Sequence, residues 1–288
     1  WRNGEYFTEL ITEKTIEYMR EMNGSGNPFF LYVPFNAPHY PMHAPQEYVD
    51  RFPDLPWDRQ MMAAMISSVD DAIGKILNEA ERLGVGDNTL SIFMSDNGPS
   101  RESRNWLDGT LDPYYGGTVG KLKGHKGSLY EGGIRLPGIM RWPDQIEGGR
   151  VTNQPCVAMD VVPTVLEAAG VASDAYEIDG TSLMGLLGDG DRMPERTIFW
   201  EWGEQTAVRQ GKWKLVLEGK LVEYENPIAA VHLADLDVDP SESNNLADAE
   251  PEIAAELTRL VQDWRDGIEK RWSDEFGAPD VAQRRVAG

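Results

Sequence analysis

The sequence is poor in several residue types, and each shortage excludes a class of protein. It holds one cysteine, Cys156, and four histidines among its 288 residues. A single cysteine cannot form an internal disulfide framework, and four scattered histidines argue against a histidine-rich metal site. No stretch approaches the roughly 20 consecutive apolar residues that a membrane-spanning helix needs. We therefore expect no membrane partner.

Positive charge is also scarce. The 27 Lys and Arg residues face 48 Asp and Glu, which gives a formal net charge of -21. Nucleic acid and anionic membranes are therefore excluded as partners, because the long-range field repels both. An anionic substrate is compatible only where local cations and a metal ion reverse that field. Hydrophobic residues make up 41% of the chain, which suffices for one large or two smaller domains.

The first part of the chain alternates between apolar strands and amphipathic helices. Residues 8–22 and 58–84 have helical spacing, and the apolar runs 29–35 and 90–94 are typical of buried strands. Strand, long helix and strand in this order predict a parallel sheet covered on both faces. A short strand is expected at 136–143, followed by a short helix at 159–171.

The pattern changes near residue 195. Short runs, "RTIFWEW", "TAVRQ", "KWKLVLEG" and "KLVEYEN", are separated by turn residues and predict an antiparallel sheet. An amphipathic helix over 250–272 closes the chain. The fold class is therefore α/β, with an α/β domain over 1–194 and an antiparallel-sheet subdomain with its closing helix over 195–288.

The strand at 90–94 stops abruptly at Asp96-Asn97-Gly98-Pro99. Ligands of parallel α/β sheets bind beyond the carboxyl ends of the strands, and the Asp96 carboxylate and Asn97 amide are oxygen ligands suited to Ca²⁺ or Mg²⁺. The alternative is a plain Asx turn. A hard cation takes about six or more ligands, so the others must come from elsewhere.

Two further side chains suit an oxyanion. His39 lies between prolines in "NAPHYP", where its imidazole could donate to an oxyanion or a leaving group. Lys126 lies between glycines in "GHKGS", and its ammonium suits a tetrahedral oxyanion. The alternatives are a loop histidine bonded to backbone and a solvated lysine. Glu131 and Arg135 are expected to form a structural charge pair around Gly132-Gly133.

A long aperiodic segment, 99–128, is rich in Gly, Tyr, Arg and Trp, and loops of this length in compact domains are usually functional. Substrate contact through cations and aromatic stacking is one interpretation, and surface packing is the other. The candidate substrate-binding residues are Arg101, Arg104, Trp106, Tyr114 and His125.

In combination, five collinear segments resemble the sulfatase family of the alkaline-phosphatase-like superfamily. They are "PFFLYVPFNAPHYPMHAPQEYVDRF", "SIFMSDNGP", "GHKGSLYEGGIRLP", "MDVVPTVLEAAG" and "AVRQGKWKLV" with the later "LADLDVDPSESNNLA". The resemblance implies that Asp96 and Asn97 are ligands of Ca²⁺ (or Mg²⁺). It implies that His39 contacts the sulfate near the leaving oxygen and that Lys126 binds a sulfate oxygen. A hydrated formylglycine, made from Cys or Ser, is the family's nucleophile.

The chain departs from the family pattern at that nucleophile. No Cys/Ser-x-Pro-x-Arg motif is present, and in "NGPSR" Asn97 stands where the cysteine would be. The early Asp-Asp metal pair and a second Lys and His are missing too. The chain begins at Trp1, and no leader peptide is visible. We therefore expect the C-terminal part of a sulfatase, inactive alone, with the formylglycine and the missing N-terminal part of the same protein upstream.

The resemblance implies hydrolysis of a sulfuric ester, with a small-molecule (aryl) or carbohydrate sulfate ester as substrate and periplasmic or secreted localisation. Two alternatives stay open. One is a phosphate or phosphonate ester hydrolase of the same superfamily, and the other is a non-catalytic module that binds sulfate esters.

Overall fold

The computed structural model describes residues 4–101, 117–172, 176–188 and 193–277. The chain forms two compact units, each built from two segments. The first unit comprises Trp1–Met94 with Gly138–Pro194, and the second comprises Ser95–Pro137 with Glu195–Gly288. Each unit is described by itself below.

The first unit holds mainly helices. In chain order its elements are α1 (Phe7–Ser25), α2 (Gln46–Val49), α3 (Trp57–Arg82), β1 (Ser91–Met94), β2 (Gly138–Arg141), the 3-10 turn η1 (Ala158–Asp160), α5 (Val161–Ala168) and α6 (Met184–Leu187). The predicted helices at 8–22, 58–84 and 159–171 and the strand at 136–143 are confirmed within a few residues.

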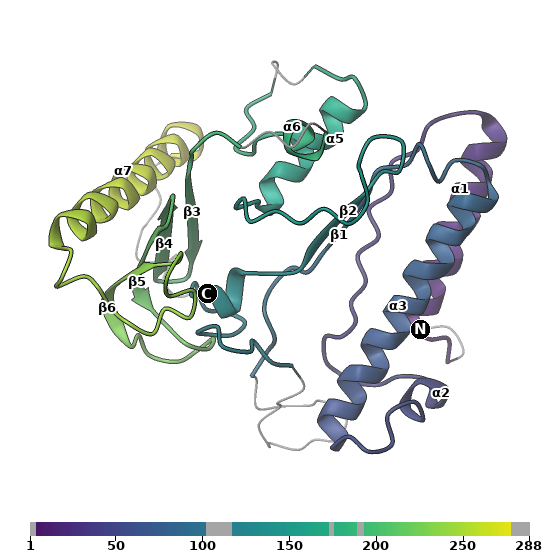
Figure 1. Cartoon of the computed structure of the whole chain (residues 1–288), viewed down its shortest axis with the longest axis horizontal. Helices are drawn as coiled ribbons and strands as arrows, with labels where there is room; N and C mark the ends of the chain where they lie inside the picture. Colours follow the sequence, from purple (N-terminus) through teal and green to yellow (C-terminus); the bar gives the residue numbers. More distant parts are fainter. Residues whose placement is uncertain (1–3, 102–116, 173–175, 189–192, 278–288) are drawn as a thin grey trace. The chain divides into compact units, whose positions relative to one another are not determined.

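Helices α1 and α3 pack side by side (Figure 1). The buried face of α3 contains Ala64, Ser68 and Ala72, spaced four residues apart, whereas Ile66 is half exposed. Toward the end of α3, the buried Glu79 carboxylate accepts hydrogen bonds from Arg82 and from Arg20 of α1. These bonds lower the pKa of Glu79 to about 2, so the carboxylate is ionised and links the two helices.

The predicted strand at 29–35 is not formed. Phe30 and Tyr32 are 69% and 80% exposed, and no hydrogen-bonded partner strand runs beside them in the part of the chain that the structure describes. An extended segment becomes a strand only when a neighbour accepts its backbone hydrogen bonds, so an apolar run alone is not enough. β1 instead pairs antiparallel with β2, from Ser91 opposite Arg141 to Met94 opposite Gly138. Both sheets formed by the described residues are antiparallel, so the predicted parallel pairing of 29–35 with 90–94 is absent there.

The second unit is organised around an antiparallel sheet, as predicted. Its order is β3-β4-β5-β6, with β3 Thr197–Trp202, β4 Gln205–Gln210, β5 Trp213–Gly219 and β6 Ala229–Asp235. Tight turns containing Gly203 and Gly211, both at positive φ, connect β3 to β4 and β4 to β5. The short helix α4 (Glu131–Ile134) and the long helix α7 (Pro251–Phe276) complete the unit.

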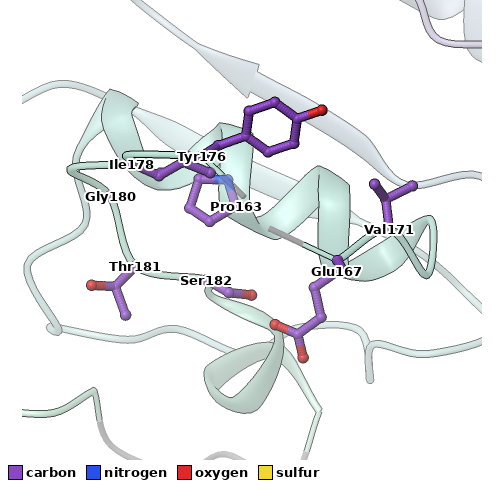
Figure 2. Close-up of a pocket in the computed structure, with 9 residues that line it drawn as sticks. Pro163, Glu167, Val171, Tyr176, Ile178, Gly180, Thr181 and Ser182 are labelled. Atoms are coloured by element: carbon purple, nitrogen blue, oxygen red, sulfur yellow. The ribbon is translucent and has the colours of Figure 1, made fainter. Parts of the chain in front are cut away.

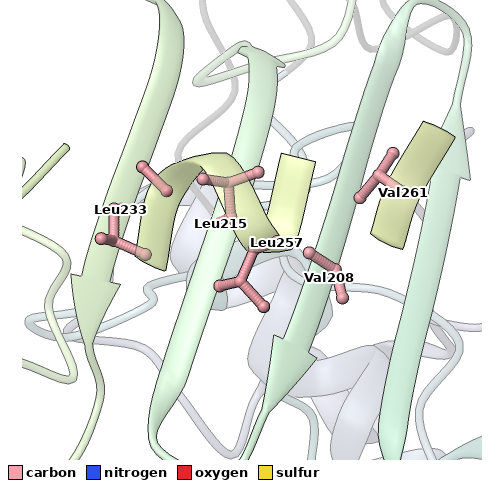
Figure 3. Packing of buried hydrophobic residues seen from close by; sticks show 6 residues of the cluster. Val208, Leu215, Leu233, Leu257 and Val261 are labelled. Carbon is pink, nitrogen blue, oxygen red and sulfur yellow. The ribbon is translucent and has the colours of Figure 1, made fainter. Parts of the chain in front are cut away.

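Helix α7 lies across one face of this sheet (Figure 1). Leu257 and Val261 of α7 point onto the strands, as Figure 3 shows. The buried members of this core are Val208, Leu215, Leu233, Ala254, Leu257 and Val261. Each strand alternates between this core and the opposite face, which supports the loop described next.

The predicted strand "KLVEYEN" over 220–226 is wrong, because β6 at Ala229–Asp235 takes its place in the sheet. The backbone of 220–226 turns away, with Tyr224 at φ 66°. Leu221 accepts the N–H of His125 at 2.9 Å, and Glu223 donates to the carbonyl of Lys126 at 3.3 Å. The segment therefore supports the loop that holds the predicted anion-binding lysine.

Candidate active site

The turn that follows β1 is closed by its own side chains. The Asp96 carboxylate accepts the N–H of Asn97 at 3.0 Å, and the Ser95 hydroxyl donates to the Asn97 carbonyl at 3.1 Å. Asp96 is exposed and Asn97 is half-buried. This bond joins adjacent residues, whereas an Asx turn joins residues two apart, and the turn presents a carboxylate and an amide side by side.

Gly98 fixes this turn against the loop that contains Lys126. Its N–H donates to the Gly133 carbonyl at 2.9 Å, and a Cβ at position 98 would lie 2.0 Å from the Gly132 carbonyl oxygen. Only glycine fits there. The Lys126 N–H in turn donates to the Pro99 carbonyl at 3.0 Å. The second unit therefore brings Asp96-Asn97 and Lys126 into one hydrogen-bonded assembly.

The Lys126 loop rests on the four-stranded sheet. The Gln205 side chain at the start of β4 donates to the Gly127 carbonyl at 2.8 Å, and its oxygen accepts the N–H of Lys220 at 2.9 Å. The Ser128 hydroxyl donates to the Lys220 carbonyl at 2.6 Å. Lys126 itself is half-buried. Its backbone is therefore fixed, which favours a defined position for its ammonium group.

His125 and Arg101 interact in the same unit. His125 is 8% exposed, and burial lowers its pKa, with a further contribution from the Arg101 guanidinium. The imidazole is therefore neutral at physiological pH and can accept as well as donate a hydrogen bond. Arg101 is exposed. The other predicted substrate-binding residues, Arg104, Trp106 and Tyr114, lie outside the described residues.

His39 belongs to the first unit. Its N–H donates to the Asn36 carbonyl at 2.9 Å, and its ring Nδ1 lies 2.8 Å from the Tyr40 carbonyl oxygen. A carbonyl oxygen can only accept, so this contact assigns the proton to Nδ1. The side chain is exposed. Its main-chain and Nδ1 contacts match the alternative interpretation of a loop histidine bonded to backbone.

Asp96 and Asn97 offer part of the donor set of a metal site. Across residues 4–101, 117–172, 176–188 and 193–277, no three or more His, Cys, Asp or Glu side chains gather as a metal-binding group. The oxygens of Asp96 and Asn97 have the hard-ligand chemistry of a Ca²⁺ or Mg²⁺ site, and they supply two of about six to eight ligands. These two residues fit part of such a site.

A polar cluster behind the loop was not predicted as a unit. Lys214 of β5 is fully buried, and its Nζ lies 2.8 Å from Glu131 Oε1 and 3.1 Å from Glu242 Oε1. Arg135 lies 3.7 Å from Glu131, so the predicted Glu131–Arg135 pair is present, but Lys214 is the closer partner. The available signal was a lysine within the apolar run "WKLVLEG".

A pocket in the first unit lies apart from these residues in sequence. Figure 2 shows its lining, with the Glu167 carboxylate of α5, the Tyr176 ring and the hydroxyls of Thr181 and Ser182. Its volume is about 620 Å³. None of the predicted site residues that the structure describes is among its lining residues.

His232 of β6 packs against Tyr130, which follows the Lys126 loop. Its ring stands at 89° to that of Tyr130 with the centroids 5.2 Å apart. Burial, with a smaller contribution from Lys123, lowers the pKa of His232 to about 4 from an ordinary value of 6.5. The folded protein therefore disfavours a proton that the unfolded chain takes up below pH 6.5.

This pKa shift predicts a pH-dependent stability. Between pH 8 and pH 5 the wild type should lose about 2 kcal/mol more unfolding free energy than His232→Gln, because only the wild type must keep a buried imidazole neutral. Denaturant unfolding of both proteins at the two pH values measures the difference. Carboxylate titrations are common to both and cancel. Parallel pH curves would contradict the assignment.

The chain is similar to known sulfatases along most of its length. Residues 1–171 match the family model "Sulfatase", and residues 124–267 match the model "N-sulphoglucosamine sulphohydrolase, C-terminal". Bovine (Bos taurus) arylsulfatase A is 30% identical over 266 residues, which cover 85% of this chain and 50% of that protein. Mouse (Mus musculus) N-acetylgalactosamine-6-sulfatase is 30% identical over 208 residues, covering 72% and 38%.

Solved structures show the same fold. The crystal structure of Ps i-CgsB has a TM-score of 0.76 at 26% identity and covers 92% of this chain and 56% of that one. A phosphonate monoester hydrolase from Silicibacter pomeroyi has a TM-score of 0.62 at 20% identity, over 93% of this chain and 60% of that one, which shows the fold alone.

The chain belongs to the sulfatase family. The predicted alkaline-phosphatase-like α/β class is confirmed by the structural neighbours. The chain spans about half the length of the curated relatives it matches.

Proposed function

We propose that these residues form part of a sulfuric ester hydrolase. One observation carries the proposal: in a chain of the sulfatase family, hydrogen bonds join the Asp96-Asn97 turn to the backbone of Lys126. This juxtaposition pairs oxygen ligands for a hard cation with a cation for a sulfate oxygen. Both would neutralise charge that develops as the ester bond breaks.

Each residue then has a distinct role. Asp96 and Asn97 would hold part of the Ca²⁺ or Mg²⁺ shell, and Lys126 would bind a sulfate oxygen. His39 would contact the sulfate near the leaving oxygen. A formylglycine, when present upstream of this chain, supplies the nucleophile. Residues 1–288 contain no Cys/Ser-x-Pro-x-Arg motif, so we expect them to be inactive alone.

A sulfated carbohydrate is the substrate class that the neighbours favour. One relevant structure is that of Ps i-CgsB in complex with k-i-k-neocarrahexaose, at 24% identity. Another neighbour was solved with D-glucosamine-2-N,6-O-disulfate, at 23% identity and a TM-score of 0.52. Arg101 and the neutral His125 provide donors and an acceptor suited to sugar hydroxyls or a second sulfate. An aryl sulfate would use the same sulfate contacts.

We also infer that the protein functions outside the cytoplasm, in the periplasm or after secretion, because the family resemblance implies export. No helix in the described part of the chain is long and apolar enough to cross a membrane. Fractionating the source cells and assaying each fraction for sulfatase activity tests this inference.

The experiment that tests the function compares esters of the same alcohol. The complete gene product, loaded with Ca²⁺, is assayed with 4-nitrophenyl sulfate, 4-nitrophenyl phosphate and a 4-nitrophenyl phosphonate ester. A higher kcat/KM on the sulfate supports the proposal, and a higher value on a phosphorus ester supports the phosphorus-ester alternative. Binding of sulfated sugars without turnover of any ester supports the non-catalytic module.

A further inference from the structure

The buried ion cluster behind the Lys126 loop consists of Lys214, Glu131 and Glu242. Lys214 and Glu242 are 0% exposed and Glu131 is 4% exposed. Each comes from a different part of the second unit: β5, the first residue of α4, and the segment after β6. Burial raises the pKa of Glu242, whereas Lys214 opposes that shift. The cluster therefore concentrates charge where charge is costly.

Glu242 holds the Lys126 loop at two places. Its carboxylate accepts the backbone N–H of Glu131 at 2.6 Å, and its carbonyl accepts a hydrogen bond from Lys123 Nζ at 3.1 Å. Lys123 and Glu131 lie three residues before and five residues after Lys126. Glu242 thus forms hydrogen bonds to residues on both sides of Lys126, and its carboxylate is ion-paired with Lys214.

The same chain of hydrogen bonds continues to the Asp96-Asn97 turn. Gly132, which follows Glu131, donates its N–H to the Lys123 carbonyl at 2.6 Å. The next residue, Gly133, accepts the N–H of Gly98 at 2.9 Å. A displacement at Glu131 would therefore move the acceptor that fixes the turn carrying the proposed metal ligands.

Stability alone does not explain this cluster. Replacing a buried ion pair or triad by apolar residues of similar volume is often neutral or stabilising, and in some proteins buried polar groups are kept because they select one conformation. A sub-ångström placement matters at a catalytic site, where a shift of about 1 Å costs about 100-fold in rate.

We propose that Glu242, held by Lys214, is a positioning residue that fixes Lys126 relative to Asp96-Asn97. The inference rests on the proposed sulfate-ester hydrolysis. It assigns Glu242 no contact with the substrate. The residue acts through the backbone of Glu131 and the side chain of Lys123.

The test compares two variants of the complete gene product. Glu242→Gln keeps the volume and an acceptor but removes the charge that Lys214 holds. Val261→Ala removes buried volume between α7 and the sheet, where Val261 is 1% exposed, and serves as the destabilised control. Thermal unfolding, kcat and KM on 4-nitrophenyl sulfate, and hydrogen exchange of the peptide 123–135 are measured for both.

We expect Glu242→Gln to lower kcat by about 10- to 100-fold and to speed exchange in 123–135. Val261→Ala should lose thermal stability through the cavity that it leaves and keep kcat and KM within about twofold. Glu242→Asp keeps the charge, but its shorter side chain moves the carboxylate away from the Glu131 N–H, so it should give the same kinetic loss as Glu242→Gln. This second variant keeps the test possible if Glu242→Gln folds poorly.

Three results would overturn the inference. Wild-type kcat in both Glu242 variants, or faster exchange without a kinetic loss, would make the cluster purely structural. Equal kinetic losses in Val261→Ala would attribute the effect to instability. A wild type that hydrolyses no sulfate ester would instead overturn the proposed function, and this inference would fall with it.

Discussion

Lys126→Ala is expected to lower kcat/KM for a sulfate ester by about 10²- to 10³-fold. In the proposed site the Lys126 ammonium meets a sulfate oxygen that gains charge as the ester bond breaks, and removing one such preorganised donor typically costs this much. The loop backbone is bonded to Pro99, Leu221 and Glu223, so truncation of the side chain leaves the loop in place. The kinetics are measured on the complete gene product with 4-nitrophenyl sulfate.

Lys121→Ala is the matched control, because Lys121 is an exposed lysine five residues earlier in the same segment. It should keep kcat/KM within about twofold. Lys126→Arg keeps the charge with a different shape and should lose less than the alanine variant. The role of Lys126 is refuted if Lys126→Ala and Lys121→Ala behave alike.

Lys214→Met is expected to destabilise the second unit by about 3–5 kcal/mol. The substitution leaves the buried carboxylates of Glu131 and Glu242 without their shared cation, and breaking a buried pair from one side costs this much. The Glu242 pKa, already raised by burial, should rise further. The loss of unfolding free energy should therefore shrink from pH 8 to pH 5, as the Glu242 carboxyl group takes up a proton.

Lys212→Met provides the control. Lys212 precedes β5, and its Nζ lies 2.6 Å from Asp235, but its side chain is 47% exposed. Asp235 is buried, but the Lys212 ammonium reaches solvent, which screens the pair, so this variant should unfold much closer to the wild type than Lys214→Met. Thermal unfolding at pH 8 and pH 5 compares both variants with the wild type. Similar small effects for Lys212→Met and Lys214→Met would contradict the account of the buried cluster.

The sequence pattern predicted the helices and hairpin strands that are specified by residues close together in the chain. Periodicity located α1, α3 and α7, and turn residues separated β3, β4 and β5, because amphipathic spacing and tight turns are written in neighbouring residues. The segment 29–35 and the run 220–226 were mispredicted as strands. Strand formation depends on a partner elsewhere in the chain. β6 pairs with β5, at the position in the sheet that 220–226 was expected to occupy.

The candidate site shows the same division. The Asp96-Asn97 turn and the glycine-flanked Lys126 were visible as sequence patterns, and the family resemblance gave them roles. The joining of Gly98 to Gly133 and of Lys126 to Pro99 depends on contacts 27 to 35 residues apart. The hydrogen bond from the Glu131 N–H to the Glu242 carboxylate joins residues 111 positions apart. No local pattern encodes such contacts, so only the structure could reveal them.

The central claim is that Asp96, Asn97 and Lys126 share one sulfate-ester site. A crystal structure of the complete gene product with Ca²⁺ and a bound sulfate tests it most directly. The account predicts side-chain oxygens of Asp96 and Asn97 about 2.3–2.6 Å from the metal. It also predicts a sulfate oxygen about 2.7–2.9 Å from Lys126 Nζ. A metal ion or a sulfate bound away from these residues would contradict the account.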